Sequence, residues 1–218
     1  MPEGLSFDEL NKLYDEQRDG ETRSMSYEQY FGEMDLSREQ KQRRMETARK
    51  VEDFILLALM TMYYMQQGGG YDYGSVTTDV AESYTSLLEE LGIPLTAYFS
   101  AVHPQSVAAE IVNTTVQNPE EIYNYTIDRA MMIAENEANF IWNDAEFEEA
   151  VRSGKTRKRW RAIMDKRTRR THAEANGQTV PIMEPFEVGG WLLLRPGDDS
   201  MGAPPEELVN CRCTVVYY

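Results

Sequence analysis

The residue types that bind metal ions lie in the last third of this sequence. Cys211 and Cys213 are the only cysteines, and His172 is one of two histidines. Zinc accepts thiolate and imidazole ligands, and its structural sites have four protein ligands, so Asp165 or another group would take the fourth position. Cys-x-Cys is tighter than the usual zinc spacing, however, and two small buried thiols in a final strand are the alternative. We therefore predict no cofactor, with zinc at these four residues as the candidate exception.

A catalytic arrangement would also have to use this part of the chain. Asp165, Arg169 and His172 stand at i, i+4 and i+7, so a helix through them would place all three side chains on one face. A surface ion pair beside a hydrogen-bonded histidine explains the same pattern. The sequence contains no Gly-x-Ser-x-Gly, no phosphate-binding glycine-rich loop and no His-Glu-x-x-His. We predict that the protein is not an enzyme, and we keep a metal-dependent hydrolase or nuclease as the alternative.

A basic segment surrounds these residues. Residues 152–172 contain ten Lys and Arg residues against one acid, although the whole chain has a formal net charge of −15. Such a segment can neutralise nucleic-acid phosphates, or it can pair with an acidic partner or with the acidic remainder of the chain. Aromatic residues are not interleaved at base-stacking spacing, so we favour protein contact over DNA. The candidate contact residues are Arg157, Lys158, Arg159, Arg161, Lys166, Arg167, Arg169 and Arg170.

The composition is that of a globular protein without a membrane segment. Hydrophobic residues make up 41% of the 218 residues, which suffices for a core. The longest apolar run is residues 54–65, whereas a membrane-spanning helix needs about 20 residues. The N-terminus lacks the basic and apolar regions of a secretory signal, and a disulfide between Cys211 and Cys213 would be strained. We therefore expect free thiols, no membrane contact and synthesis in a cytoplasm.

The chain up to residue 152 has the patterns of helices. Capping boxes at Ser6 and Ser37 precede apolar stripes of helical spacing, and glycines follow these stripes. Asn118 and Pro119 have the residue types of a helix start, and acidic residues follow them. The expected helices span residues 7–18, 27–31, 38–67, 78–91, 104–116 and 119–152.

The C-terminal residues change to short apolar runs separated by turn residues. The expected elements are strands at residues 185–188, 191–195 and 211–218 and a helical turn at residues 204–208. We expect the small sheet to form around Trp160, Phe186 and Trp191. The fold class is therefore α+β, with a mostly helical N-terminal body and a small C-terminal module that contains the strands.

The order of certain residues in the C-terminal part resembles a known family. These residues are Trp160, Asp165, Arg167-Thr-Arg169, His172, Asn176-Gly-Gln178, Pro185-Phe186, Gly189-Gly190, Pro196-Gly-Asp198 and Asn210-Cys-Arg-Cys213. Their order resembles the C-terminal domain of phage head-morphogenesis proteins, the minor head proteins similar to protein F of phage Mu. The resemblance defines a module at residues 129–218 and leaves residues 1–128 as a helical region for assembly and partner contacts.

The resemblance implies a minor structural protein of a tailed-phage head, present in few copies. It also implies a role in procapsid assembly near the portal, and an association with DNA packaging or ejection. The implied partners are portal or capsid proteins, with packaged DNA as a further contact, and the implied location is the host cytoplasm during assembly and then the virion head. Because five residues follow Cys213, we expect none of the toxin or enzyme domains that some family members carry. A DNA-binding accessory that uses the basic segment is the remaining alternative.

Overall fold

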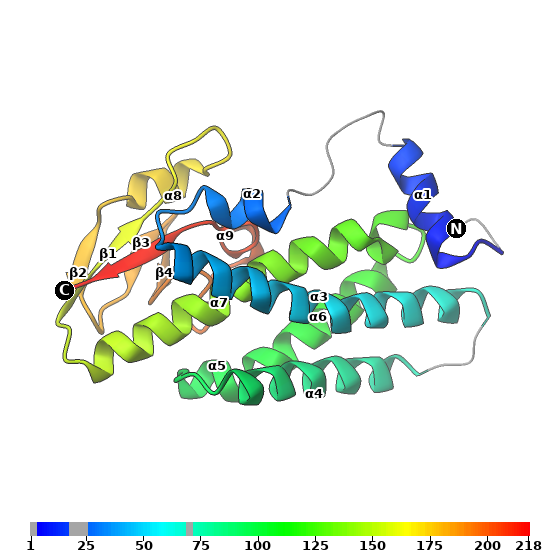
Figure 1. The fold of residues 1–218 in the computed structure, drawn as a ribbon, viewed down its shortest axis with the longest axis horizontal. Coiled ribbons are helices and arrows are strands. Elements are labelled where there is room, and N and C mark those ends of the chain that lie inside the picture. The colour runs from blue at the N-terminus through cyan, green and yellow to red at the C-terminus, as the bar shows by residue number, and fades with distance from the viewer. Residues whose placement is uncertain (1–3, 18–25, 69–71) are drawn as a thin grey trace. The chain divides into compact units, whose positions relative to one another are not determined.

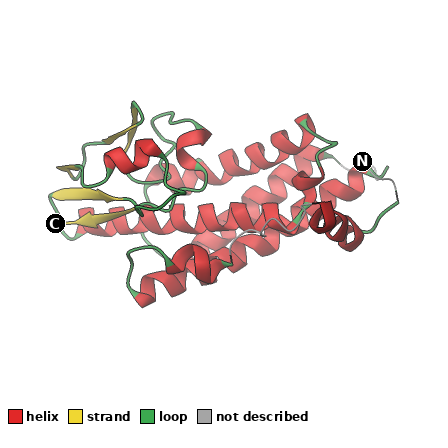
Figure 2. Ribbon diagram, turned by 90° about the horizontal axis from the view of Figure 1, so that it is seen from above, coloured by secondary structure: helices red, strands yellow, loops and turns green. Residues whose placement is uncertain are grey.

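The computed structural model describes residues 4–17, 26–68 and 72–218, and most of these residues are helical (Figure 1). The long helices occupy the chain up to residue 152. The described strands lie between residues 157 and 217, near the C-terminus in Figure 2. The predicted α+β fold, with a helical N-terminal body and a small C-terminal module of strands, is therefore confirmed. Within the described ranges, no helix has both the length and the apolar character needed to cross a bilayer.

Contacts between residues divide the chain into two compact units. The first, which we call the helical unit, contains Met1–Met25, Ala48–Gly92 and Phe99–Ala134. The second, which we call the mixed unit, contains Ser26–Thr47, Ile93–Tyr98 and Glu135–Tyr218. Each unit thus draws on three separate segments, and the division into functional domains between residues 128 and 129 stays a prediction.

The helical unit has an aromatic core. Its elements are α1 (Phe7–Gln17), α4 (Tyr73–Leu91), α6 (His103–Gln117), η1 (Ile122–Tyr125) and parts of α3 (Arg38–Gln66), α5 (Ala97–Ala101) and α7 (Ile127–Arg152). Tyr63, Tyr84 and Tyr125 are fully buried, and the rings of Tyr63 and Tyr125 lie 5.7 Å apart. The predicted capping box of α1 is present, because the side chains of Ser6 and Glu9 each accept a hydrogen bond from the other residue's amide.

Two helix starts in this unit differ from the sequence prediction. α4 begins five residues earlier than predicted, because the side chain of Asp72 caps it. Asn118 and Pro119 do not open a helix, since Asn118 ends α6 and η1 follows. α7 begins only after Thr126, whose Oγ1 accepts a hydrogen bond from the Arg129 amide at 3.2 Å.

The strands of the mixed unit form antiparallel sheets. β1 (Arg157–Arg161) lies between β2 (Thr179–Pro181) and β5 (Thr214–Tyr217), and β3 (Phe186–Val188) forms a hairpin with β4 (Trp191–Leu193). The helices α2 (Tyr27–Gly32), α8 (Arg170–Ala175) and α9 (Pro205–Leu208) also belong to this unit. In Figure 1, β5 runs beside β1 and ends next to the C-terminus.

The sequence patterns did not predict β1, and no continuous helix runs through Asp165, Arg169 and His172. β1 ends at Arg161 and α8 begins only at Arg170. Trp160 and Phe186 form the predicted core, with ring centroids 5.2 Å apart. Trp191, in contrast, is 43% exposed, because β4 turns only its last residue inward. The closing strand is also shorter than predicted and begins after the cysteines.

Candidate metal centre and basic face

The structure brings His172, Cys211 and Cys213 together. Nδ1 of His172 lies 3.4 Å from Sγ of Cys213 and 3.6 Å from Sγ of Cys211. The three ligand atoms all lie within 4.8 Å of one another, and all three residues are buried. Both thiols are free, as predicted. α8 supplies the histidine and the loop before β5 supplies the cysteines, so a small buried cluster joins two distant parts of the chain. We call it the thiol–histidine cluster.

Glu207 of α9 fixes the histidine ring from the side opposite the thiols. Nε2 of His172 lies 3.1 Å from Oε2 of Glu207 and 3.1 Å from its backbone oxygen. Thr171 donates a hydrogen bond to the same carboxylate oxygen at 2.8 Å. Both neighbours of Nε2 are acceptors, so Nε2 carries the proton. When the ring is neutral, the lone pair of Nδ1 therefore faces the two sulfur atoms, whereas in the protonated ring Nδ1 donates a hydrogen bond to sulfur.

Three asparagines of α7 hold the backbone of the cysteine loop. Asn136, Asn139 and Asn143 share one face of the helix, because they stand at i, i+3 and i+7. The side-chain amide of Asn139 donates to the carbonyl of Cys211 at 2.9 Å, and that of Asn143 donates to the carbonyl of Cys213 at 3.3 Å. All three asparagines are buried. The sequence analysis missed them, although three asparagines at helical spacing in one helix were a visible signal.

Arg44 of α3 fixes the orientation of two of these amides. Its guanidinium is fully buried and donates to Oδ1 of Asn139 at 3.2 Å and to Oδ1 of Asn143 at 3.4 Å. The same guanidinium forms a two-point ion pair with Glu146, at 3.0 and 3.1 Å. Because each asparagine oxygen faces Arg44, each NH2 group must face the loop carbonyls. Arg44 therefore supports the cluster indirectly, through the asparagines that bind the cysteine loop.

The loop itself begins with an unusual backbone conformation. Asn210 has a φ of 58°, in the left-handed region that asparagine tolerates better than most residues. Its amide donates to Oδ1 of Asn136 at 2.7 Å. The hydroxyl of Tyr30, on α2, donates to the carbonyl of Cys211 at 3.3 Å. Hydrogen bonds from two helices thus fix the position of Cys211.

Asp165, the predicted fourth ligand, lies elsewhere. Its two oxygens accept hydrogen bonds from the guanidinium of Arg212, each at 2.8 Å, and Oδ1 also accepts from the amide of Arg167 at 2.9 Å. Burial alone would raise the pKa of Asp165, but these hydrogen bonds outweigh burial and lower it to about 2. The assignment of Asp165 is corrected, because the helix that would have aligned it with His172 does not form.

The cluster also controls the protonation of its own members. The hydrogen bond from the Cys213 thiol lowers the pKa of Cys211 well below its ordinary value, against the effect of burial, and His172 lowers it further. The pKa of Cys213 is raised well above its ordinary value, because its thiol donates that hydrogen bond and is itself buried. Burial lowers the pKa of His172, but the hydrogen bond with Cys211 outweighs it. A thiolate on Cys211 is therefore favoured, and the thiolate is the form that binds metals.

β1 places the cationic residues of the basic segment on opposite sides of the sheet. Its outward-facing residues, which we call the basic face, are Arg157, Arg159 and Arg161. Lys158 points inward, is fully buried and donates to the carbonyl of Leu194 at 2.6 Å. Its ammonium lies 5.0 Å from the ring centres of Phe147 and Phe186, and burial lowers its pKa to about 7. Lys158 is therefore a core residue, which corrects its assignment as a contact residue.

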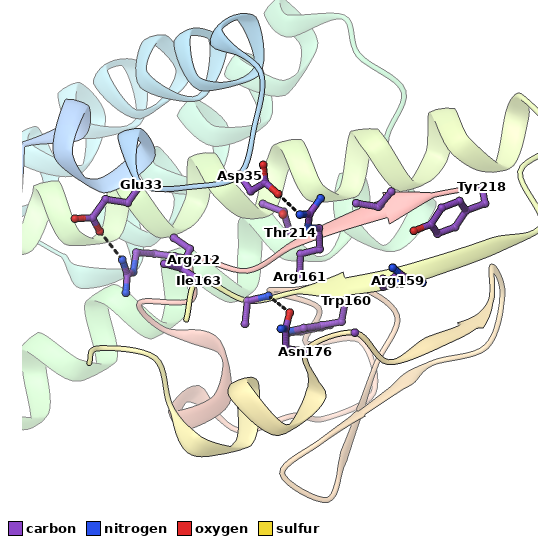
Figure 3. A pocket seen from close by; sticks show the side chains of 13 residues that line it. Glu33, Asp35, Arg159, Trp160, Arg161, Ile163, Asn176, Arg212, Thr214 and Tyr218 are labelled. Atoms are coloured by element: carbon purple, nitrogen blue, oxygen red, sulfur yellow. Dashed lines mark hydrogen bonds and ion pairs between the residues drawn. The ribbon is translucent and has the colours of Figure 1, made fainter. Parts of the chain in front are cut away.

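Acidic residues of the same unit pair with several of the predicted contact residues. Arg161 pairs with Asp35, and Glu33 pairs with both Arg167 and Arg212. Figure 3 shows Arg161 directed at Asp35 and Arg212 directed at Glu33. The predicted pairing with the acidic remainder of the chain therefore exists for part of the segment.

The remaining contact residues differ in their surroundings. Arg169 donates to the carbonyl of Val209 and so holds α9 near the cysteine loop. Arg170 pairs with Glu174 within α8 at 2.7 Å, and Lys166 is exposed. Arg169 thus has a structural role, whereas Lys166 and Arg170 remain accessible.

A hollow lies beside the basic face. It has a volume of about 380 Å3, and Figure 3 shows side chains from β1, β5 and the segment before α3 around it. Arg159 lies along one side, with its guanidinium 5.6 Å from the centre of the Tyr218 ring. Nε of Arg159 donates to Thr179 Oγ1 at 3.1 Å. The arginine is therefore held in place by an aromatic ring and a neighbouring strand.

The family of phage Mu protein F-like proteins matches residues 102–216, which is more than half of the chain. The chain therefore belongs to this family of phage head-morphogenesis proteins. The match begins upstream of the C-terminal module at residues 129–218, and it includes the thiol–histidine cluster, its asparagines and the basic face.

Among curated proteins, the chain is similar to an NAD(+)–arginine ADP-ribosyltransferase of Enterococcus faecalis. The two are 35% identical over 112 residues, which are 50% of this chain and 22% of the relative. The chain thus corresponds to about a fifth of that protein. No solved structure matches the chain.

Proposed function

We propose that this protein is a minor, non-enzymatic component of a tailed-phage head that acts in procapsid assembly near the portal, with a role in DNA packaging or ejection. The observation that carries the proposal is the family match over residues 102–216. It would assemble in the host cytoplasm and remain in the virion head.

The similarity to the ADP-ribosyltransferase is consistent with this proposal. The shared 112 residues are a small part of that relative, whereas they are half of this chain. We propose that the two proteins share the head-protein module and not a transferase centre. The direct test is incubation of the purified chain with labelled NAD+ and an arginine-containing acceptor. Catalytic turnover of NAD+ would overturn the assignment as a non-enzyme.

The basic face is the surface that we assign to a partner. Three arginines alternate along the central strand of a sheet, so their side chains leave the sheet on the same side. The chain as a whole carries a net charge of −15. Arg161 already pairs with Asp35, so the charges of this face that favour an acidic partner are those of Arg157 and Arg159. We propose an acidic surface of a portal or capsid protein as this partner.

Co-assembly with the portal and capsid proteins of the same phage tests the proposal. The chain is expected in purified procapsids, and its amount per particle is measured by quantitative immunoblotting. Charge reversal by Arg157→Glu, Arg159→Glu and Arg161→Glu together should lower incorporation about ten-fold or more, because each reversed contact costs on the order of 1 kcal/mol. Absence of the wild-type chain from procapsids and from portal complexes would overturn the proposed function.

A variant with the same charge change elsewhere serves as the control. Lys12, Lys50 and Arg152 have side chains that are 78%, 46% and 62% exposed. Their joint replacement by glutamate should lower incorporation much less than the basic-face variant does. Binding of the basic face to duplex DNA is the competing outcome. If the three arginines neutralise three phosphates, log affinity plotted against log salt concentration should have a slope of about −2.7. Such a slope, lost in the basic-face variant alone, would reassign the face to DNA.

A further inference from the structure

We propose that His172, Cys211 and Cys213 bind one divalent cation of the zinc class, with a water-sized molecule as the fourth ligand and Glu207 as the residue that positions the histidine. The inference goes beyond the proposed function, because it concerns what holds the mixed unit together and not what the head protein contacts.

The distances within the cluster fit tetrahedral zinc. With Zn–S bonds of about 2.3 Å, Zn–N bonds of about 2.05 Å and tetrahedral angles, the nitrogen and each sulfur should lie about 3.6 Å apart. The observed distances from Nδ1 of His172 are 3.4 Å to Cys213 and 3.6 Å to Cys211. A cation could therefore enter with little movement of the three ligand atoms.

The surroundings prepare the histidine as a ligand. Metal-bound histidines donate their other ring N–H to a carboxylate or a carbonyl, which fixes the tautomer and raises the basicity of the ligating nitrogen. Glu207 offers both acceptors, each 3.1 Å from Nε2 of His172. Its carboxylate is in turn held by Thr171. His172 therefore has the second hydrogen-bond partner that a metal-bound histidine needs.

The backbone of the cysteines is fixed independently of their sulfur atoms. Asn139 and Asn143 bind the carbonyls of Cys211 and Cys213, and Arg44 orients both asparagines. The sulfur atoms are thus directed at the histidine before any ion binds, which lowers the entropic cost of binding.

The space left at the cluster admits one small ligand. A cavity of about 10 Å3 is lined by all three cluster residues, and such a volume holds about one water molecule. Two sulfur ligands and an imidazole favour zinc over magnesium or calcium, which prefer oxygen. The ion would connect α8 to the loop before β5, across 39 and 41 residues of sequence. Because this closes a long loop, we expect the ion to stabilise the mixed unit.

Cobalt substitution of the full chain tests the site directly. The protein is treated with a chelator under reducing conditions and titrated with Co2+, whose thiolate charge-transfer and tetrahedral d–d absorption bands report sulfur ligation. We expect both bands to saturate at one equivalent, zinc to displace the cobalt, and the midpoint of thermal unfolding to rise with zinc. Absence of the thiolate band in the wild type would overturn the proposal, whether or not any variant folds.

Variants separate ligands from neighbours. Cys213→Ser and His172→Ala should abolish the spectrum at one equivalent. Glu207→Gln should keep the spectrum but weaken zinc affinity by about 10- to 100-fold, measured by competition with a chromophoric chelator. Asp165→Asn is the matched control and should leave affinity unchanged. An effect of Asp165→Asn as large as that of Cys213→Ser would overturn the ligand assignment. Incorporation into procapsids is a separate readout, so failure of the metal site and failure of the proposed function are distinguishable.

Discussion

Replacement of Arg44 by methionine is the most informative test of the buried network. Arg44 is fully buried, and its guanidinium pairs with Glu146 at 3.0 and 3.1 Å. Methionine keeps much of the side-chain volume and removes the charge and all the donors. In the variant, a largely buried carboxylate loses its principal partner, and the oxygens of Asn139 and Asn143 lose their donor.

The buried ion pair sets the expected loss in the free energy of unfolding of Arg44→Met. Removal of one member of a buried ion pair costs about 3–5 kcal/mol. Arg43 also contacts Glu146, at 2.7 Å, and the variant keeps Arg43, so we expect the lower end, about 3 kcal/mol. For a protein of this size the midpoint of thermal unfolding should fall by about 6–12 °C. Arg43→Met is the matched control on the same helix. Its side chain is 32% exposed, so we expect a loss of about 1 kcal/mol or less from its ion pair.

The dependence on pH gives an independent check. Burial raises the pKa of Glu146, but the charge and the hydrogen bonds of Arg44 outweigh burial and hold it below the ordinary value of 4.5. A carboxyl group with a lowered pKa in the folded state contributes stability above its ordinary pKa and loses it as the pH falls further. The difference in stability between wild type and Arg44→Met should therefore be complete at pH 7 and shrink below about pH 4.5.

Urea unfolding at pH 7 and pH 4 measures this difference, and labelling of the cysteines by a thiol reagent in the native state reports on the loop. Because Arg44 orients the asparagines that hold the loop, labelling should be faster in Arg44→Met than in Arg43→Met. A stability difference below about 1 kcal/mol at pH 7, the value of an exposed pair, would refute the reasoning, as would equal labelling rates in the two variants.

Two further variants test other buried features. The pKa of Lys158 is about 7 in the folded protein against an ordinary 10.5. Between pH 7 and pH 10.5 the unfolded chain therefore binds one proton more than the folded chain. In urea unfolding, the stability of the wild type relative to Lys158→Met should increase from pH 7 to pH 9, by up to about 1.4 kcal/mol per pH unit. A difference in stability that does not change with pH would contradict the lowered pKa. Gly197 has a φ of 84°, and a Cβ there would overlap the ring of Phe140, so Gly197→Ala should cost about 3 kcal/mol. Gly154→Ala, with a φ of 77° and open space around the added Cβ, should cost about 1 kcal/mol, and equal losses would argue against the overlap.

The residue types in the sequence were enough to predict the cluster. The prediction of a fourth ligand failed, because it depended on the local backbone conformation. His172, Cys211 and Cys213 were identified because zinc chemistry restricts the choice of ligand. Asp165 was proposed because a zinc site needs a fourth ligand, and its spacing to His172 would bring the two side chains together only on a helix. Residues 166–169 are not helical, since α8 begins only at Arg170, so that spacing carried no information about distance in space.

The supporting residues could not have been predicted as such. Three buried asparagines on one face of α7 indicate that something polar lies opposite, but they do not say what. Their partners are backbone carbonyls about seventy residues away in sequence, which no local pattern encodes. Glu207 was expected within a helical turn, and only the folded chain places its carboxylate beside His172.

The contacts of the cluster also bear on how small an independently folding piece can be. A fragment that starts at β1 would contain His172 and both cysteines, but it would lack the asparagines of α7 that hold the cysteine loop. A fragment that starts with α7 would contain the asparagines but would leave them without Arg44. Since buried polar groups without partners are costly, either fragment would lose support for the loop. The segment Ser26–Thr47, which lies far upstream in sequence but within the mixed unit, is therefore part of what keeps the thiol–histidine cluster in place.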